Sequence, residues 1–444
     1  MLKIPEYVKN VLRRLENEGY EAWCVGGCVR DLHLGRVPGD WDVTTSALPE
    51  ETMRIFGDCA LPTGLKHGTV TVKSEGRPVE VTTYRKDGDY LDHRRPESVS
   101  FTTSLEEDLL RRDFTVNAMA MDLGGQVRDP YGGLRDLEAG ILRCVGDAER
   151  RFEEDALRIL RGLRFAACLG FAIEPETAAA IHKKKALLRQ IAVERIWVEL
   201  AKLLTGGDAV RILREYVDVL GVFWPELLDM VNLDQKNHHH IYDVWEHTLH
   251  ALEQTGQDFI LRCAVLLHDV GKPACMTVDE NGVGHFYGHP DKSASMAENM
   301  LRRLKVDHAT WKTVVRLVAW HDRNIPRTDR GLRRALRELG ETELRRLLAV
   351  KRADNLAQAP ECHGIQRELD QAEWIMERLL AEDACISLKQ LAVSGRELMA
   401  LGVSGPAVGA GLELLLDAVI DELVENEREA LLAYYQTHEK GKSR

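Results

Sequence analysis

Asp40 and Asp42 are separated by a single tryptophan and are the first residues in the chain whose type and spacing suit metal chemistry. On a strand, residues i and i+2 project from the same face, so the two carboxylates would converge. Adjacent carboxylates repel each other unless a cation lies between them. Oxygen ligands at this spacing suit Mg²⁺, which takes the rest of its shell from water and substrate phosphates. An isolated pair of this kind is more often an ordinary surface feature, so its meaning depends on the residues around it.

Two glycines, Gly26 and Gly27, precede these aspartates and follow a short apolar run. A strand that ends in glycines before a helix lets backbone N–H groups approach a phosphate, and the N-terminus of the helix favours an anion. Arg30 adds a planar guanidinium that can donate two hydrogen bonds to a triphosphate. The glycines alone would fit a plain strand-to-helix turn. Together with the aspartates they predict a nucleotide-transfer site.

Six motifs follow one another over about 145 residues, and through them the sequence resembles the class II CCA-adding enzymes and the related bacterial poly(A) polymerases of the polymerase-β superfamily. The motifs occupy residues 25–31, 39–45, 80–85, 111–118, 129–134 and 154–166. The resemblance implies a polymerase-β-like head that transfers nucleotides to an RNA 3′ end.

The resemblance also implies roles for single residues. Asp40 and Asp42 would hold two Mg²⁺ ions, one activating the 3′-hydroxyl of tRNA and the other stabilising the triphosphate while pyrophosphate leaves. Glu80 would be a third catalytic carboxylate, although a solvent-facing glutamate on an alternating strand is an equal interpretation. The residues expected to bind the phosphates of the incoming nucleotide are Gly26, Gly27, Arg30 and Arg112.

Asp155, Arg158, Arg161 and Arg164 recur at every third position of a predicted helix, which places neighbouring members on one side. An exposed, salt-bridged helix face would have the same spacing. The resemblance instead implies that these residues bind the nucleotide and that the Asp155–Arg158 pair reads the base. The chemistry fits, because a carboxylate acceptor beside a guanidinium donor pairs with both cytosine and adenine, whereas uracil and guanine present the reverse pattern.

Residues 85–96 are charged and without periodicity, so a flexible loop is expected there. Family members that add only two cytidines lack part of this loop. Its full length therefore favours addition of C, C and A, and leaves addition of the final A alone as an open possibility.

A second set of chemical residues, in the C-terminal half, has the order typical of the HD phosphohydrolase superfamily. The expected metal ligands are His247, His268, Asp269, His289, His321 and Asp354. Neutral imidazoles with carboxylates suit Mn, Fe, Ni, Co or Zn better than Mg²⁺. Such a domain either hydrolyses phosphoester ends, including 2′,3′-cyclic phosphates on damaged RNA, or only positions tRNA.

Composition and charge limit the remaining classes of function. The chain has 444 residues, 44% of them hydrophobic, with no long uncharged apolar run and no apolar secretory signal at its N-terminus, so neither a membrane nor an extracellular setting is expected. Its nine cysteines form no CxxC pair, which favours a reduced cytoplasmic setting. We expect tRNA, CTP and ATP as partners, and no DNA.

The net charge of −12 is unevenly distributed. Residues 354–439 contain 5 basic and 17 acidic side chains, whereas residues 312–352 contain 12 basic and 5 acidic ones. A locally basic surface can bind phosphates on an acidic protein, because salt limits the reach of each charge to roughly 8–10 Å. Residues 316–352 are therefore better candidates for phosphate contacts than the acidic tail, which resembles the tRNA-gripping C-terminal domain of the family.

The elements that must position these residues change character along the chain. We expect a helix at 4–18, strands at 22–25 and 41–45, a hairpin of 68–73 with 78–84, and predominantly helical periodicity from about residue 147. The expected fold is α+β, a small α/β head followed by an elongated all-helical body that includes an HD domain. The expected domains are residues 1–146 (nucleotidyltransferase head), 147–230 (nucleotide- and RNA-binding neck), 231–370 (HD domain) and 371–444 (tRNA-binding tail).

The function predicted from these observations is addition of C, C and A to the tRNA 3′ end from CTP and ATP, with HD-domain phosphohydrolase activity as a second prospect. A poly(A) polymerase shares every head motif, but such enzymes usually carry a basic C-terminal extension and no metal-competent HD set. An enzyme that adds only A would also fit the motifs, as would an HD phosphohydrolase whose head is an inactive RNA-binding relic.

Overall fold

The computed structural model describes residues 3–87 and 99–442, and contacts divide the chain into two compact units. The first unit consists of Met1–Leu228 with Arg303–Val306, and the second of Asp229–Arg302 with Asp307–Arg444. None of the described helices is long and apolar enough to cross a membrane. Division into four domains remains a prediction.

The head of the first unit is built on a seven-stranded mixed sheet with the strand order β3-β4-β5-β2-β1-β8-β9. These strands are β1 (Ala22–Val25), β2 (Asp42–Thr45), β3 (Ala60–Gly64), β4 (Thr69–Ser74), β5 (Arg77–Thr83), β8 (Ala120–Met121) and β9 (Val127–Arg128). Within the sheet, β5 is parallel to β2, whereas β1 is antiparallel to its two neighbours. The sheet therefore brings segments from distant parts of the head side by side.

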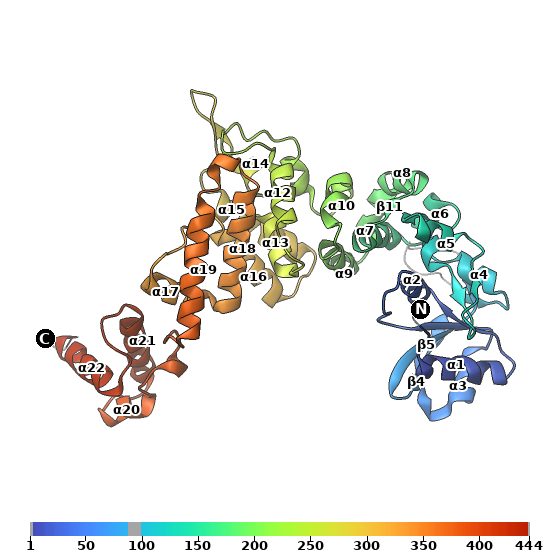
Figure 1. The fold of residues 1–444 in the computed structure, drawn as a ribbon, viewed down its shortest axis with the longest axis horizontal. Helices are drawn as coiled ribbons and strands as arrows, with labels where there is room; N and C mark the ends of the chain where they lie inside the picture. Colours follow the sequence, from blue (N-terminus) through green and yellow to red (C-terminus); the bar gives the residue numbers. More distant parts are fainter. Residues whose placement is uncertain (1–2, 88–98, 443–444) are drawn as a thin grey trace. The chain divides into compact units, whose positions relative to one another are not determined.

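Short helices cover and connect this sheet. They are α1 (Glu6–Asn17), α2 (Gly27–His33), α3 (Pro49–Phe56), α4 (Leu105–Leu110) and α5 (Gly133–Glu138). The expected N-terminal helix is confirmed as α1, which buries Val8, Val11, Leu12 and Leu15 at the spacing of one helix face. Figure 1 shows α1 and α3 beside strands β4 and β5.

The chain after the head is helical, as expected. The remaining helices of the first unit are α6 (Ala148–Glu154), α7 (Leu157–Leu169), α8 (Pro175–Lys184), α9 (Val193–Leu204), α10 (Ala209–Glu215) and α11 (Val217–Leu220). Helix α7 buries apolar side chains along its whole length and packs against α9. One short parallel ladder joins β10 (Ile141–Leu142) to β11 (Ala172–Ile173).

The second unit is a bundle of helices with a small helical tail. Its helices are α12 (Val244–Glu253), α13 (Phe259–Leu267), α14 (Lys272–Cys275), α15 (His289–Arg303), α16 (His308–Trp320), α17 (Asp329–Leu339), α18 (Glu341–Leu356), α19 (Ile365–Ala381), α20 (Gly395–Ala400), α21 (Pro406–Ile420) and α22 (Arg428–Lys442). The body is not entirely helical, because a two-stranded hairpin, β12 (Thr277–Val278) with β13 (Gly284–His285), interrupts it. Its strands are only two residues long, too short to leave an alternating pattern in the sequence.

The expectation of a loop over residues 85–96 is partly wrong. Residues Arg85–Asp87 form strand β6, which pairs antiparallel with β7 (Val99–Phe101). Residues 88–96, on which the expectation of full CCA addition depends, lie outside the described residues.

Candidate nucleotide-transfer site and metal centre

The parallel pairing of β2 with β5 places Asp42 directly beside Glu80, as Cα partners in the sheet register. Val79 and Val81 are buried on one face of β5, so Glu80 lies on the exposed face, as its alternation predicts. Asp40 lies in a bend just before β2 rather than on the strand itself. Asp40 and Asp42 nevertheless line the same cavity, so the predicted convergence is found although its strand geometry is not.

The electrostatics of Asp42 reflect this crowding. Burial raises the pKa of the Asp42 carboxyl, the charge of Arg112 opposes that effect, and the charges of Glu80 and Asp40 raise the pKa further. In the described part of the chain, two sets of three side chains have ligand atoms within 4.8 Å of one another, and both sets lie elsewhere. Asp40, Asp42 and Glu80 therefore do not form a ready-made metal-binding triad among the described residues. A divalent cation would relieve their repulsion, which is what a Mg²⁺ site requires.

The cavity at this edge of the sheet has a volume of about 410 Å³. Its walls hold most of the residues predicted to bind a nucleotide: Gly26, Gly27, Arg30, Arg112, Arg161 and Arg164 all line it with the two aspartates. Two carboxylates surrounded by several guanidinium groups suit the binding of a triphosphate together with a divalent cation.

Gly26 is held in a conformation that side chains avoid, with a φ of +80°. A Cβ added here would lie 3.0 Å from Nη1 of Arg112, which is tighter than ordinary packing. The glycine therefore serves both the turn between β1 and α2 and the close approach of Arg112 to the backbone.

A chain of polar contacts links two of the cavity arginines. Arg30 donates from Nη1 to Oδ1 of Asn117 at 2.7 Å, and Asn117 donates from Nδ2 to Oδ1 of Asp113 at 3.2 Å. Arg161 donates to Oδ2 of the same aspartate from Nε at 2.8 Å and from Nη2 at 2.6 Å. Burial alone would raise the pKa of the Asp113 carboxyl, but Arg161 and the hydrogen bonds outweigh it and hold that pKa at about 2.

The ring of Phe165 lies beneath the guanidinium groups of three of the arginines that line the cavity. The guanidinium carbons of Arg30, Arg161 and Arg164 lie 5.2, 5.4 and 3.9 Å from its ring centroid. Arg164 also donates from Nε to Oε2 of Glu199 at 2.5 Å. Stacking on an aromatic ring holds each guanidinium plane while leaving its edge available for anions.

Asp155 and Arg158 are placed differently from the sequence prediction. Helix α7 begins at Leu157 with Ala156 as its N-cap, so Asp155 lies just before it, at the C-terminal end of α6, and accepts from the backbone N–H of Leu157 at 3.0 Å. Nη2 of Arg195 lies 3.4 Å from Oδ2 of Asp155. The predicted single helix face was wrong at its first member, because residue spacing alone does not show that one helix ends at Glu154 and the next begins at Leu157.

Arg158 is buried and has partners of its own. It donates to Oε2 of Glu154 at 2.8 Å and to the backbone oxygen of Arg111 at 2.9 Å. Neither Arg158 nor Asp155 is among the residues that line the cavity of Asp40 and Asp42. Their predicted role in reading the base therefore stays a prediction.

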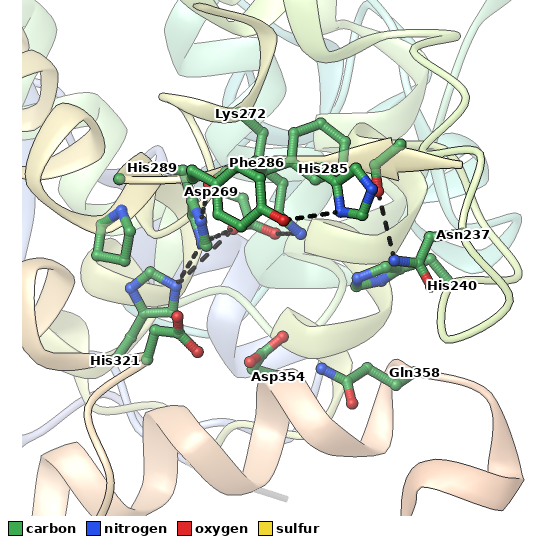
Figure 2. A pocket seen from close by; sticks show the side chains of 15 residues that line it. Asn237, His240, Asp269, Lys272, His285, Phe286, His289, His321, Asp354 and Gln358 are labelled. Carbon is green, nitrogen blue, oxygen red and sulfur yellow. Dashed lines mark hydrogen bonds and ion pairs between the residues drawn. The ribbon is translucent and has the colours of Figure 1, made fainter. Parts of the chain in front are cut away.

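The second site gathers all six predicted HD ligands. Those within one set are His247, His268 and Asp354, and those within the other are Asp269, His289 and His321. They come from α12, the C-terminal ends of α13 and α16, the start of α15, and α18. Figure 2 shows Asp269, His289, His321 and Asp354 around one pocket, which also contains Lys272 and His240.

The four histidines of this centre are oriented in the same way. Their Nδ1 atoms lie 2.7 to 3.3 Å from backbone carbonyl oxygens, those of Ala357, Val265, Phe286 and Val318. A carbonyl oxygen can only accept, so each Nδ1 carries a proton and each Nε2 can present a lone pair to the centre. Backbone contacts of this kind fix the tautomer of metal-binding histidines.

The atoms at the centre are poorly compatible with one another without a cation. Nε2 of His289 lies 3.2 Å from Nε2 of His321, and both lone pairs would meet there. The side-chain oxygens of Asp269 are buried, and their charged neighbours in the described residues are Lys272 and the histidines of the centre. Burial lowers the pKa of the His268 imidazole, yet the carboxylates of Asp269 and Asp354 outweigh it and raise that pKa to about 10. Burial and the charge of His268 instead lower the pKa of the His321 imidazole, to about 3.

Asp269 faces both sets. Its Oδ2 lies 3.2 Å from Nε2 of His268 and 3.6 Å from Nε2 of His247, while its Oδ1 lies 3.4 Å from Nε2 of His289 and 3.9 Å from Nε2 of His321. A carboxylate with one oxygen toward each of two histidine pairs is suited to bridge two metal ions. Lys272 also contacts it, with Nζ 2.7 Å from Oδ2.

Sequence reasoning missed four residues of these sites: Asp113, Asn117, Phe165 and Lys272. The first three belong to motifs that were recognised, but their partners are defined only by the fold. Lys272 follows the HD pair by three residues, which places it one helical turn from Asp269, and this spacing could have identified it.

Models of three protein families match successive parts of the chain. They are the "Poly A polymerase head domain" over residues 22–143, the "Probable RNA and SrmB- binding site of polymerase A" over residues 170–227, and the "HD domain" over residues 237–359.

The chain is also similar to curated proteins. It is 50% identical over 229 residues to a CCA-adding enzyme of Geobacillus kaustophilus and 54% identical over 203 residues to that of Geobacillus stearothermophilus. These matches cover 51% and 46% of this chain, and 56% and 50% of the relatives. The chain thus spans about half the length of the curated relatives it matches.

Among solved structures, that of the Bacillus stearothermophilus CCA-adding enzyme in complex with CTP is 31% identical with a TM-score of 0.71, and the match covers 99% of this chain and 98% of that one. A Thermotoga maritima CCA-adding enzyme complexed with tRNA is 20% identical with a TM-score of 0.56 over 97% and 95% of the two chains, and shows a shared fold alone.

Proposed function

This chain belongs to the family of CCA-adding enzymes, and from that membership we propose that it adds C, C and A to the 3′ end of tRNA. CTP and ATP are the donors, and pyrophosphate is the product that leaves. The proposal rests on one observation. Asp40 and Asp42 line the same cavity as the arginines that are expected to bind the nucleotide, namely Arg30, Arg112, Arg161 and Arg164.

In the proposed reaction the 3′-hydroxyl oxygen of tRNA forms a bond to the α-phosphorus of the nucleotide. The bond from that phosphorus to the bridging oxygen breaks, and the hydroxyl proton is released. Asp40 and Asp42, with Glu80 beside them, would hold Mg²⁺, which supplies the charge that stabilises the triphosphate. Arg30 and Arg112 are placed to bind the phosphates.

We assign base selection to Asp155 and Arg158, in keeping with the family resemblance. Both side chains have other partners in this structure, so the assignment requires them to exchange Arg195 and Glu154 for the base. Replacing Arg158 with alanine should loosen the preference for C and A before it slows the reaction. An unchanged preference, measured with all four nucleotides in competition, would remove this role.

Incubation with a tRNA that lacks its 3′ end tests the main proposal. CTP and ATP are supplied separately and together with Mg²⁺, and the products are resolved to single nucleotides. We expect two additions with CTP alone, a third with ATP, and no further growth. Unlimited addition of A would identify a poly(A) polymerase, and addition of A only to a tRNA that already ends in CC would identify an A-adding enzyme.

For the second centre we propose two transition-metal ions, chosen from Mn, Fe, Ni, Co and Zn, which the two sets of side chains would hold, with Asp269 offering one oxygen to each set. When bound, such ions supply a Lewis acid for hydrolysis of phosphoester ends, including 2′,3′-cyclic phosphates. The shared orientation of the four imidazoles supports this proposal. Lys272 lines the same pocket, with its ammonium on Asp269 and on Oε1 of Gln235, where it would help to hold a phosphate.

Metal analysis tests the bridging role. After loading with Mn²⁺ or Ni²⁺ and removal of free metal, the wild-type chain should retain two ions outside the Mg²⁺ site. Replacing Asp269 with asparagine should lose both, because the amide carries no negative charge and leaves only one oxygen for the two sets. Replacing the exposed Asp291 with asparagine is the matched control. Retention of one ion by the Asp269 variant would show that the carboxylate serves a single metal.

The partners and the compartment follow the same proposal. ATP is assigned with CTP because the product requires both, and neither DNA nor a membrane has a role in the reaction. We place the protein in the cytoplasm, where tRNA and both nucleotides are available.

A further inference from the structure

Helix α17 carries four arginines on one face. Arg330, Arg333, Arg334 and Arg337 follow the spacing i, i+3, i+4 and i+7, which lies along one side of a helix. They account for a third of the 12 basic residues in the segment 312–352. This surface is here called the arginine face of α17.

The arginine face is paired with acidic residues of the tail, on and just after helix α21. Arg330 and Arg334 lie 3.0 and 2.6 Å from the two carboxylate oxygens of Asp421. Arg333 lies 2.8 Å from Glu422. Arg337 contacts both Asp417 and Glu413. The acids at 413, 417 and 421 recur every four residues, so the two rows match along their length.

The apolar core of the tail does not extend into this joint. Its cluster of buried side chains, together with the half-buried ones packed on it, draws every described member from residues 385–435. The buried leucines of α17, at 332, 336 and 339, are not among them. Among the described residues, side-chain bonds from α17 to α21 are therefore between arginines and carboxylates.

Such a joint is weak and depends on salt. The side chains of Arg330, Arg334 and Asp417 are 52, 57 and 62% exposed, whereas those of Asp421, Arg333 and Arg337 are 15, 21 and 27% exposed, so each pair has one side chain that is largely open to solvent. Exposed ion pairs contribute little to stability, and salt screens them further, with a screening length of about 8 Å at physiological ionic strength. A competing polyanion can therefore displace the acidic helix.

Phosphate is a chemical match for the displaced groups. A guanidinium donates two parallel hydrogen bonds to a carboxylate or a phosphate alike, so a surface that holds four carboxylates is also suited to an RNA backbone. We propose that the arginine face of α17 binds RNA phosphates and that the acidic residues of α21 cover it as an intramolecular competitor. RNA as the partner rests on the proposed function.

Binding of tRNA that lacks its 3′ end to the full chain, followed by fluorescence anisotropy, tests the competition. The double variant D417N/D421N removes two charges from the joint. The control E427Q/E429Q removes two charges from exposed positions of the same tail, away from the arginine face. We expect the Kd of the joint variant to be about five-fold lower than that of the control, because loss of the charges of Asp417 and Asp421 releases three arginines from pairs that each contribute little. Equal values in the two variants would overturn the proposal.

A distance measurement provides the second readout and does not require a substitution in the joint. Fluorophores at the exposed positions Gln371 on α19 and Gln436 on α22 report whether the tail is docked. Saturating tRNA, or KCl raised to about 1 M, should lengthen the mean distance. An unchanged distance with bound tRNA would contradict the proposal.

Reversal of the charges controls for misfolding. R337E should undock the tail, and adding E413R and D417R to it should restore the short distance. Nucleotide addition measured on the same samples separates this inference from the proposed function. A chain that adds C, C and A but shows equal affinities overturns this inference alone, whereas one that shows the competition but adds nothing overturns the function alone.

Discussion

Asn117 connects two charged residues through opposite ends of its amide. Its Oδ1 accepts from Arg30 and its Nδ2 donates to Asp113. An amide can do both because it carries an acceptor and a donor on one carbon. Asn117 is therefore a positioning residue that fixes Arg30 relative to the Asp113–Arg161 pair.

Replacing Asn117 with aspartate keeps the shape and removes the donor. A carboxylate oxygen would then face Asp113 at about 3 Å, and the added negative charge should draw Arg30 into a tighter ion pair and leave it less available to an incoming triphosphate. We expect kcat/KM for CTP to fall about 10- to 100-fold, mostly through a higher KM, because a buried polar network loses roughly 1–3 kcal/mol when one member is mismatched.

Asn17→Asp is the matched control for this substitution, because it makes the same atomic change at an exposed position of the head. Steady-state kinetics with a tRNA that ends in C measures both variants. A fall in kcat with an unchanged KM in the Asn117 variant would show that the residue acts on the reaction step rather than on nucleotide binding.

The low pKa of Asp113 makes the stability of the head depend on pH. Its pKa of about 2 lies below the usual value of 3.8. A depressed carboxyl pKa contributes stability above the unfolded pKa and loses it as the pH falls toward the folded one. The shift corresponds to about 2 kcal/mol at neutral pH, of which about 1 kcal/mol should be lost between pH 6 and pH 3.

Urea unfolding of the wild type and of Asp113→Asn at both pH values measures this contribution. The asparagine cannot titrate, so the difference in free energy of unfolding between the two proteins should shrink by about 1 kcal/mol from pH 6 to pH 3. A difference that is the same at both pH values would mean that Arg161 does not stabilise the charged carboxylate.

A functional residue can be predicted best when the evidence for its role lies in neighbouring residues of the sequence. The spacing of Asp40 and Asp42 predicted that they would lie together, and both line one cavity; the six predicted HD ligands likewise fall into two clusters, while their role as metal ligands stays a prediction. Asp155 was misplaced because its spacing from Arg158 does not reveal the break between helices α6 and α7. Asn117 was missed because its two partners, at 30 and 113, are brought to it only by the folded chain.

Among the elements, the turn from β1 to α2 carries the sharpest constraint. Gly26 there combines a positive φ with a close neighbour, Arg112. Gly19 also has a positive φ, +89°, but nothing lies within 4 Å of an added Cβ. Alanine substitutions at the two glycines therefore distinguish the effect of backbone strain, which both share, from the effect of a close contact with Arg112, which only Gly26 has.

Gly26→Ala should cost activity beyond the loss of stability, whereas Gly19→Ala should cost stability alone. Backbone strain destabilises each variant by about 1 kcal/mol. The displaced Arg112 should in addition raise KM for CTP about 10-fold or more in the first variant, if one charge-assisted phosphate contact is lost. Thermal unfolding and nucleotide addition measured on both proteins test this, and equal KM values would exclude Arg112 from phosphate binding.

The elements themselves were predictable where their periodicity is local. Helix α1 and the hairpin of β4 and β5 lie within two residues of their expected bounds. The parallel pairing of β2 with β5 was not predicted, although it is what places Glu80 beside Asp42. The order of strands depends on tertiary packing between segments about 40 residues apart, and no local pattern records it.

For the whole molecule, the uneven charge has a structural explanation. The basic segment that was expected to contact phosphates is largely paired within the chain: besides the arginine face, Arg345 contacts Glu377 and Arg352 contacts Asp370 and Glu373. Composition located the two charged regions correctly. It could not show that they lie against each other, because that depends on the packing of α17, α18, α19 and α21.

The two candidate metal sites lie in different compact units, Asp42 in the first and Asp269 in the second. No residue is shared between them, and each draws its ligands from elements of its own unit. The two activities should therefore fail independently. Asp42→Asn should lower nucleotide addition at least about 100-fold, as expected when a carboxylate that holds the catalytic cation is removed, and should leave transition-metal content unchanged.

Asp269→Asn should do the reverse, abolishing retention of Mn²⁺ or Ni²⁺ while nucleotide addition stays within about two-fold of the wild type. Circular dichroism of both variants controls for folding, since an asparagine keeps the shape of each aspartate. If either substitution reduced both nucleotide addition and metal retention in a folded protein, the two sites would be energetically coupled, and the division of the reactions between the two units would be wrong.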